Sequence, residues 1–326
     1  MRRDAPGPLL ALVGPTASGK TEASLELAGR LGAEIVAVDS MVVYRGMDVG
    51  TAKPTLEQRA AVPHHLIDVA DPAEPFSVAR FQVLSRDALE AIRSRGHLAL
   101  LVGGSGLYFR AVVDDLVFPG TDPATRAGLE REAAALGPAR MHARLREADP
   151  AAAAKIEPGN VRRTVRALEV AALTGRPFSH FSETWERLPP GRVRAAGIRL
   201  APAILGERIK ARVRRMIEEE GLVEEVRSLL DGGLGRFLTS SQAIGYLEVA
   251  EHLRGAISLD EAARRAERRT KALARRQMAW FRRDPRIRWF DGGTEGARGR
   301  IDDIERFLHA GKEQREVDET AGRKGG

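Results

Sequence analysis

The chain has 326 residues, enough for one large or two medium domains, and its hydrophobic content of 43% is ordinary for a globular protein. Cysteine is absent, so disulfides and thiolate metal sites are excluded and a reducing, cytoplasmic setting is favoured. No apolar run approaches the roughly 20 residues of a membrane helix, and the N-terminus lacks the form of a secretory signal, so we expect a soluble protein without a membrane partner.

The net charge of +7 is concentrated in one segment. Residues 261–290 hold eleven Lys and Arg against three acids, so this window alone carries +8, more than the whole chain. A localised basic block indicates a polyanionic partner, although a solvated helix face gives the same pattern.

The first predicted element is a strand over residues 8–13, which runs into GPTASGKT and then into a helix over residues 21–31. The spacing of Gly14, Gly19, Lys20 and Thr21 fits a phosphate-binding loop. In such a loop, backbone N–H groups and a helix N-terminus point at one anion. We expect Lys20 to add a point charge and the Thr21 hydroxyl to lie where Mg²⁺ bridges to phosphate oxygens. The predicted phosphate-binding residues are Gly14, Pro15, Thr16, Ala17, Ser18, Gly19, Lys20 and Thr21.

Two further apolar runs, residues 34–39 and 97–102, are typical of buried strands, and a helix is predicted between them over residues 77–95. Strands that alternate with helices predict an α/β fold, a P-loop NTPase-like parallel sheet flanked by helices. Functional residues of such sheets gather at the carboxyl ends of the strands. Asp39 and Ser105 follow two of these ends, so we expect both to converge on the phosphate loop.

From about residue 118 to 190 helix formers dominate, which predicts an all-helical domain inserted into a catalytic core made of residues 1–117 and 191–310. A return strand is predicted over 197–200, helices over 204–230, 242–253 and 259–283, and a last strand over 287–290. The polar tail, residues 311–326, is expected to be disordered. In the 259–283 helix one face turns to the protein and another to solvent. The first comprises Ala266, Thr270, Leu273, Gln277 and Trp280, and the second Arg264, Arg268, Lys271, Arg275 and Arg282.

A phosphate held by this loop has three possible fates. Hydrolysis in motor-type enzymes needs an acid at a strand end to hold Mg²⁺, and the third apolar run ends in Gly103 and Gly104 instead. In a small-molecule kinase Asp39 would take a proton from an accepting hydroxyl. In the third case diphosphate is the leaving group of an attack by another nucleophile.

Seven motifs decide among these fates, because they resemble, in order, those of the tRNA dimethylallyltransferases, also called tRNA isopentenyltransferases. They are GPTASGKT (14–21), VDSMVVYRGMDVGTAKP (38–54), PHHLIDV (63–69), LVGGSGLYFRA (101–111), VRRTVRALEV (161–170), QAIGY (242–246) and ARRQMAWFR (274–282). The resemblance covers nearly the full chain, and YRGMDVGTAKP followed by PHHLID is far more specific than the phosphate loop. It implies transfer of a dimethylallyl group from dimethylallyl diphosphate to the exocyclic amine of the adenosine just 3′ of a tRNA anticodon.

The resemblance also implies roles for individual residues. Asp39 would be the base that accepts a proton from the amine. Thr16 and Lys20, with the loop amides and a Mg²⁺ cofactor near Thr21, would stabilise the departing diphosphate. Ser105 stands where the family has threonine in GGTG, and its hydroxyl can still donate. Arg208 and Arg212 would contact the diphosphate, although a helix-surface pair explains them nearly as well.

The partner implied is a tRNA anticodon stem-loop, bound by an enzyme expected to be a monomer. The implied tRNA-binding residues are Asp39, Ser40, Met41, Val42, Ser105, Arg126, Arg162, Arg163, Arg166, Gln242, Gly245, Tyr246, Arg275, Arg276, Gln277 and Arg282. Three positions depart from the family pattern: Val42 replaces a frequent glutamine, Gly159 an asparagine and Leu247 a basic residue. At Val42 an apolar packing contact is what we expect.

Other functions leave part of the sequence unexplained. A nucleotide or metabolite kinase has no use for the basic helix, and a non-catalytic RNA-binding switch has no need of Asp39. An adenylate prenyltransferase of cytokinin synthesis needs no cationic surface of RNA size. His64 and His65 have no acidic or histidine partner at ligand spacing, so we expect them to be structural.

Overall fold

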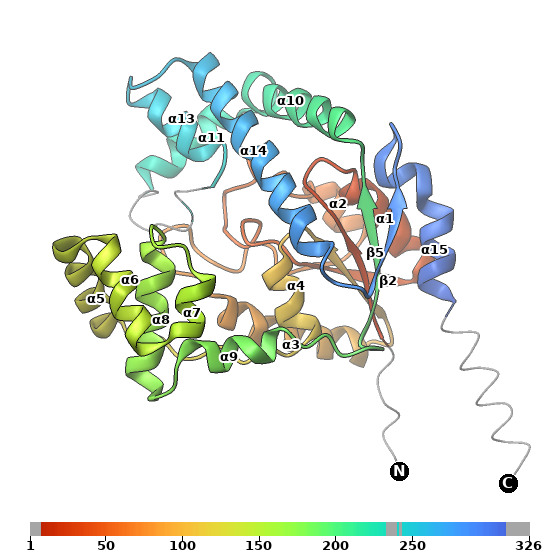
Figure 1. The fold of residues 1–326 in the computed structure, drawn as a ribbon. Coiled ribbons are helices and arrows are strands. Elements are labelled where there is room, and N and C mark those ends of the chain that lie inside the picture. The colour runs from red at the N-terminus through yellow and green to blue at the C-terminus, as the bar shows by residue number, and fades with distance from the viewer. Residues whose placement is uncertain (1–7, 233–239, 241–242, 311–326) are drawn as a thin grey trace, which may run out of the picture. The chain divides into compact units, whose positions relative to one another are not determined.

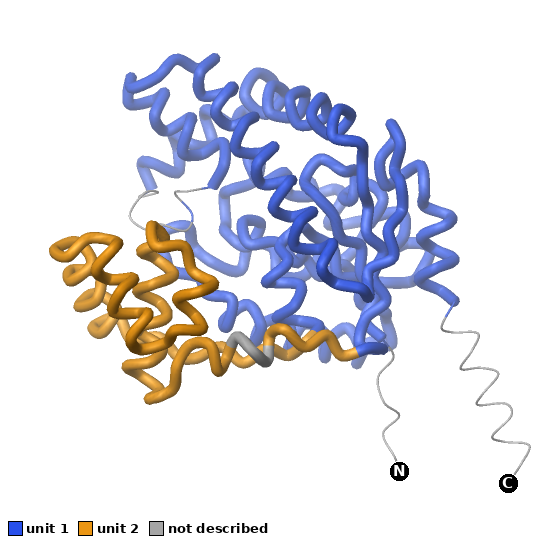
Figure 2. The backbone as a smooth tube through the Cα atoms, viewed as in Figure 1, with its two compact units in different colours: residues 1–113, 190–326 blue, residues 114–189 orange. Residues whose placement is uncertain are grey.

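The computed structural model describes residues 8–232, 240 and 243–310, so the predicted disordered tail and Gln242 lie outside the described residues. The chain forms two compact units (Figure 2). The first comprises residues 1–113 and 190–326, and the second is residues 114–189, the region where the sequence predicts a helical insertion. No helix in the described part of the chain is long and apolar enough to cross a membrane.

The first unit is built on a six-stranded sheet in the order β3-β2-β4-β1-β5-β6, and every pair of neighbouring strands is parallel. The strands are β1 (Leu9–Val13), β2 (Ala33–Ala37), β3 (His64–His65), β4 (Leu98–Gly103), β5 (Val193–Arg199) and β6 (Ile287–Asp291). This confirms the predicted parallel α/β fold. The prediction missed β3 and began β5 four residues too late.

Helices cover both faces of this sheet (Figure 1). The described helices of the first unit are α1 (Lys20–Leu31), α2 (Leu56–Ala61), α3 (Val78–Ser94), α4 (Gly106–Val113), α10 (Pro202–Glu218), α11 (Leu222–Asp231), α13 (Tyr246–Leu253), α14 (Leu259–Phe281) and α15 (Ile301–His309), with a 3₁₀ turn η1 (Gly296–Arg300). The helix predicted over 204–230 is therefore two helices. The chain breaks at Gly221, whose φ of 83° suits glycine because it lacks a Cβ. The last helix, α15, was not predicted.

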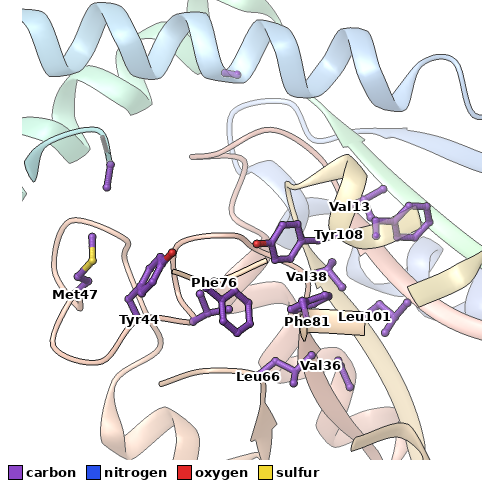
Figure 3. Packing of buried hydrophobic residues seen from close by; sticks show 14 of the residues in the cluster. Val13, Val36, Val38, Tyr44, Met47, Leu66, Phe76, Phe81, Leu101 and Tyr108 are labelled. Carbon is purple, nitrogen blue, oxygen red and sulfur yellow. The ribbon is translucent and has the colours of Figure 1, made fainter. Parts of the chain in front are cut away.

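Strand residues alternate between two hydrophobic cores, because successive side chains point to opposite faces of a sheet. Leu10, Leu12 and Leu100 pack on one face with residues of α1 and α15. Val13 and Leu101 pack on the other face, in the larger core. Figure 3 shows part of that larger core, in which aromatic rings from α3, α4 and the loop after β2 gather beyond the ends of the strands. The helices on this face thus meet the carboxyl edge of the sheet.

The second unit is helical throughout its regular elements: α5 (Pro123–Leu136), α6 (Pro138–Ala148), α7 (Pro150–Lys155), α8 (Val161–Thr174) and α9 (Phe178–Trp185). Asp122 and Asp149 cap α5 and α7, and a proline follows each cap at the first helical position. This cap-then-proline pattern is favourable at helix N-termini because the missing proline N–H would have no partner there anyway. Asn160 caps α8, and the helices enclose a small core of their own.

Candidate active site

A cavity of about 1110 Å³ opens at the carboxyl ends of the strands in the first unit. Its lining joins the phosphate loop, the residues after β2 and β4, and the facing sides of α10 and α14. The predicted residues in this lining are Thr16, Ala17, Ser18, Gly19, Lys20, Thr21, Asp39, Val42, Arg208, Arg212 and Gln277. Residues far apart in sequence, predicted to serve one reaction, therefore share one cavity.

The phosphate loop has the backbone conformation that its glycines suggest. Gly19 has a φ of 81° and is the N-cap of α1, so the N-terminus of this helix lies at the loop, as predicted for an anion site. A Cβ at Gly14 would lie 2.8 Å from the backbone oxygen of Ile198, so the loop can pass β5 only with glycine there. The Thr16 N–H donates to Gln277 Oε1 at 2.8 Å. The expectation that the loop amides point at the anion is therefore corrected at Thr16, whose N–H has a protein partner.

Lys20 is folded back onto its own loop. Its Nζ donates to the backbone oxygen of Pro15 at 2.6 Å and to Ser18 Oγ at 3.3 Å. Burial, and next the Arg212 guanidinium, lower the pKa of Lys20 to about 7, against the opposite effect of Asp39. A lysine with this pKa gains much from an anion, since a nearby negative charge favours its protonated form.

Two arginines of α10 complete the cationic wall of the cavity. Arg212 Nη1 lies 3.4 Å from Thr16 Oγ1, and burial lowers the pKa of this guanidinium. Arg208 Nη1 is buried and has no hydrogen-bond partner among the described residues. An unpaired buried donor is costly unless a ligand satisfies it. Both arginines are half-buried and line the cavity, which favours their anion-binding role over a plain helix-surface pair.

A turn after β6, which sequence analysis missed, supports the loop from outside. The Ala297 N–H donates to the Ser18 backbone oxygen at 3.0 Å. At Gly296, with a φ of 72°, a Cβ would lie 2.3 Å from Arg208 Nη1. The available signal was the glycine-rich run from Gly292 to Gly296, which has no strand or helix periodicity.

Asp39 stands at the end of β2 and lines the cavity. Its Oδ1 accepts the Met41 N–H at 2.8 Å, which fixes the carboxylate relative to the backbone. Ser105 is held next to it, because the Ser105 N–H donates to the Val38 backbone oxygen at 3.2 Å. Ser40 and Met41 are half-buried, whereas Val42 is 8% exposed and lines the cavity as an apolar surface.

The loop from Tyr44 to Pro54 is fixed from two sides by residues that sequence analysis did not single out. The buried Nζ of Lys53 lies 2.6 Å from both Asp48 and Asp68, and it donates to the Tyr44 backbone oxygen. Glu225 of α11 accepts the N–H groups of this loop, at 2.8 Å in the case of Val49. The motif YRGMDVGTAKP is thus a rigid wall of the cavity.

Two predicted tRNA-binding residues lie inside the protein. Tyr246 is fully buried, and its hydroxyl donates to Glu225 Oε1 at 2.5 Å. The Gly245 N–H donates to Glu248 Oε2 at 2.8 Å in the first turn of α13. Both residues therefore make contacts inside the protein, whereas the sequence predicted direct contacts with RNA.

Among the described residues, the arginines of the basic helix α14 have acidic partners in its first half but not in its second. In its first half, arginines pair with acids: Arg264 and Arg268 both contact Glu261. In its second half Arg275, Arg276 and, just beyond it, Arg282 are exposed and make no ion pair with any residue that the structure describes. Gln277 is half-buried on the other side of the helix, against the phosphate loop. The uncompensated charge therefore begins at Arg275.

In the second unit the predicted tRNA-binding arginines also divide into two kinds. Arg126 and Arg166 converge on Glu169, which is fully buried, with Nη2 and Nη1 at 2.6 and 2.8 Å from its Oε2. Arg162 and Arg163 are exposed at the start of α8. The first pair holds the unit together, and the second pair has its charge available to a ligand.

The histidines have structural partners, as predicted. His64 Nδ1 contacts the Val62 backbone oxygen, and His65 Nε2 lies 2.6 Å from the buried Glu34. Arg95 and His97 contact the same carboxylate. Within the described residues no group of three or more His, Asp or Glu side chains has the arrangement of a metal site.

Known proteins similar to this chain show its family. The sequence model of the family described as IPP transferase matches residues 42–284, and that of isopentenyl transferase matches residues 8–64. The chain belongs to the IPP transferase family. The chain is 52% identical to a tRNA dimethylallyltransferase of Salinispora arenicola, over 90% of this chain and 84% of the relative.

Solved structures of other proteins share the fold across the family. A tRNA isopentenylpyrophosphate transferase from Bacillus halodurans is 41% identical, with a TM-score of 0.69 over 97% of this chain and all of that one. A eukaryotic dimethylallyltransferase, described as acting on tRNA, is 26% identical, with a TM-score of 0.72 over 88% of this chain and 74% of that one. For this member of the IPP transferase family, both the α/β core and the helical insertion therefore have solved counterparts.

Proposed function

We propose that this chain transfers a dimethylallyl group from dimethylallyl diphosphate to the N6 amine of the adenosine immediately 3′ of the anticodon in tRNA, releasing diphosphate. The observation that carries the proposal is that Asp39 and the phosphate loop line one cavity, together with the cationic side chains of Lys20, Arg208 and Arg212. The names of the relatives, tRNA dimethylallyltransferase among them, support the same reaction.

The cations suit a leaving group that gains charge. Lys20, Arg208 and Arg212 come from two different elements and lie within the same lining. As the carbon–oxygen bond of the substrate stretches, negative charge accumulates on the diphosphate. Groups already oriented toward that charge lower the barrier, because they need no reorganisation at the moment of reaction. Arg208 and Arg212 follow each other by one turn of α10, so both guanidiniums can act on the same diphosphate.

The Asp39 carboxylate supplies the base. The lone pair of an adenine N6 is delocalised into the ring, so the amine is a weak nucleophile. In the reaction N6 forms a bond to C1 of the allyl group, the C1–oxygen bond breaks, and the diphosphate departs with the electron pair. The proton lost from N6 goes to Asp39. The Met41 N–H donates to Oδ1 of Asp39, so Oδ2 of the same carboxylate is the oxygen that accepts the amine hydrogen.

A Mg²⁺ ion fits this site as a companion of the diphosphate. Magnesium is commonly held by one or two protein oxygens together with substrate phosphates, and the Thr21 hydroxyl and the Glu22 carboxylate both line the cavity. Thr21, with Glu22 nearby, is the residue that would hold it. The ion would neutralise charge on the leaving diphosphate.

The RNA partner is proposed to bind through exposed arginines. Arg275, Arg276 and Arg282 near the end of α14, and Arg162 and Arg163 in the helical unit, offer charge without an internal partner among the described residues. An anticodon-loop base is unpaired, so bringing it to Asp39 costs less than extracting it from a duplex. A monomeric state and a cytoplasmic location stay predictions.

The test is incubation of the protein with dimethylallyl diphosphate, Mg²⁺ and a tRNA anticodon stem-loop, followed by mass spectrometry of the RNA. The proposal expects one added C5 unit. Asp39→Asn keeps the acceptor for the Met41 N–H but removes the base, so it should fold normally and lose activity by about 10²-fold or more. Phosphate transfer from ATP to a small molecule, with no C5 product, would instead support the kinase.

A further inference from the structure

Tyr108 on α4 is a buried phenol that the reaction described above does not use. Its position is set by close backbone contacts on one side. A Cβ at Gly103 would lie 2.2 Å from the Val38 backbone oxygen, so only glycine lets β4 come this close to the end of β2. The Ser105 N–H bond to that same oxygen then starts α4 directly beside Asp39.

Two aromatic contacts fix the orientation of α4 and of the Tyr108 ring. The Trp280 ring of α14 covers Gly106, where a Cβ would come within 2.1 Å of it. The Phe81 ring packs against Tyr108 with centroids 4.4 Å apart. Trp280 therefore fixes the helix that carries Tyr108, and Phe81 fixes the face of its ring. Tyr108 is 8% exposed.

The hydroxyl of Tyr108 points away from α4 and lies near enough to Asp39 for the carboxylate to act on it. Figure 3 shows it pointing toward the hydroxyl of Tyr44, across the space beyond Val38, the residue before Asp39. No hydrogen bond of the Tyr108 hydroxyl is found within the described part of the chain. Burial raises the pKa of Tyr108, and the Tyr44 hydroxyl and the Asp39 carboxylate raise it further. The phenol thus stays protonated and keeps a hydrogen to donate.

We propose that the Tyr108 hydroxyl donates a hydrogen bond to a ring nitrogen of the acceptor adenine, N1 or N7, while the neighbouring N6 amine faces Asp39. Both nitrogens flank the amine and are acceptors. A base held at Asp39 through N6 alone can rotate about that contact, and a second contact fixes the plane in which the lone pair meets the allyl carbon. This inference rests on the proposed function.

The test combines Tyr108→Phe, which keeps the ring and removes only the hydroxyl, with stem-loops that carry 1-deazaadenosine or 7-deazaadenosine at the target position. On the adenosine stem-loop we expect Tyr108→Phe to lower kcat/KM about tenfold. On the analogue that lacks the contacted nitrogen, wild type and Tyr108→Phe should react at nearly equal rates. The comparison of the two proteins on one RNA cancels any change in the intrinsic reactivity of the amine.

Tyr246→Phe is the matched control, because it removes the hydroxyl of another buried tyrosine, one bonded to Glu225. Its effect should be the same on all three RNAs. Equal activity of Tyr108→Phe and wild type on adenosine, or a Tyr108→Phe loss that persists on both analogues, would overturn the inference. The melting temperature of Tyr108→Phe shows whether a loss of activity comes from misfolding. If the variant misfolds, the rates of wild type on the two deaza analogues still show whether a ring nitrogen is contacted. Absence of C5 product from wild type on adenosine would instead contradict the proposed function.

Discussion

The Thr16 N–H and the Gln277 side-chain oxygen, 261 residues apart, meet at 2.8 Å, so α14 closes one side of the phosphate loop. The same side chain packs on Gly104, where a Cβ would lie 2.4 Å from Nε2. Gln277, which the sequence predicts to bind RNA, therefore also contacts the proposed diphosphate site through the phosphate loop. The helix that carries the exposed arginines also shapes the anion cradle.

Gln277→Glu should weaken diphosphate binding without unfolding the loop. The carboxylate can still accept the Thr16 N–H, but it places a negative charge beside the ligand. At about 6 Å and an effective dielectric constant of about 20, the repulsion is roughly 3 kcal/mol, or about a hundredfold in Kd. Isothermal titration with inorganic diphosphate and Mg²⁺ measures this. Gln277→Met, similar in size and uncharged, is the control and should lose less than tenfold; equal losses would contradict the electrostatic account.

Diphosphate binding should take up a proton on Lys20. The pKa of about 7 in the free protein leaves Lys20 about half protonated at neutral pH. A bound anion favours the protonated form and raises that pKa, so the bound state holds more protons than the free state between the two values. Affinity should therefore fall as pH rises above about 7, until the pKa of the complex is passed. Titration calorimetry in buffers of different ionisation enthalpy measures the uptake.

Lys20→Arg is the matched variant for this proton linkage, because an arginine stays charged throughout the range. The ligand titrates identically with both proteins, so the difference between them isolates Lys20. Lys20→Arg should show less proton uptake and a flatter affinity profile above pH 7. The same uptake in both proteins would show that Lys20 is already fully protonated before the ligand arrives.

Gly103→Ala should destabilise the first unit and reduce activity together. The new Cβ would meet backbone, the Val38 oxygen at 2.2 Å, so β2 and β4 must separate where Asp39 and Ser105 are positioned. We expect a loss of about 3 kcal/mol in the free energy of unfolding. Gly29→Ala within α1 meets nothing within 4 Å and should instead stabilise by about 0.5–1 kcal/mol. Urea denaturation measures both, and a neutral Gly103→Ala would contradict the close packing of the two strands.

Much of the fold follows from local signals. Continuous apolar runs bounded by glycine identified β1, β2 and β4. A parallel sheet buries both faces of its strands, so each strand is apolar along its whole length. The two-residue β3 carries too little pattern to be recognised. The start of β5 was missed because Arg194 interrupts the apolar run at its second residue. The break at Gly221 was missed because the helical periodicity resumes with Leu222 directly after it.

The residues of the site also fall into those that the sequence could identify and those that it could not. Residues within one motif, such as Lys20 and Asp39, could be assigned from sequence because the motif fixes their spacing. Glu225 and Gln277 act on loops about 175 and 261 residues away, and only tertiary packing brings them there. Nor does a sequence show that Arg126 has a buried internal partner in Glu169, so a charge pattern alone overestimates the surface open to RNA.

The two halves of α14 should therefore contribute unequally to RNA binding. Each phosphate contact that releases a counterion changes the slope of log K against log salt by roughly 0.7–0.9. The double variant Arg275→Gln, Arg276→Gln removes two exposed charges and should flatten the slope by about 1.5 and weaken stem-loop binding at low salt.

The matched double variant, Arg264→Gln with Arg268→Gln, removes the same charge from the other half of α14. These two arginines already contact Glu261, so less of their field reaches a phosphate and the slope should change by less than half as much. Fluorescence anisotropy with a labelled anticodon stem-loop at several salt concentrations gives both slopes. Equal changes would mean that RNA displaces the internal ion pairs, and that the whole helix, rather than its second half, is the interface.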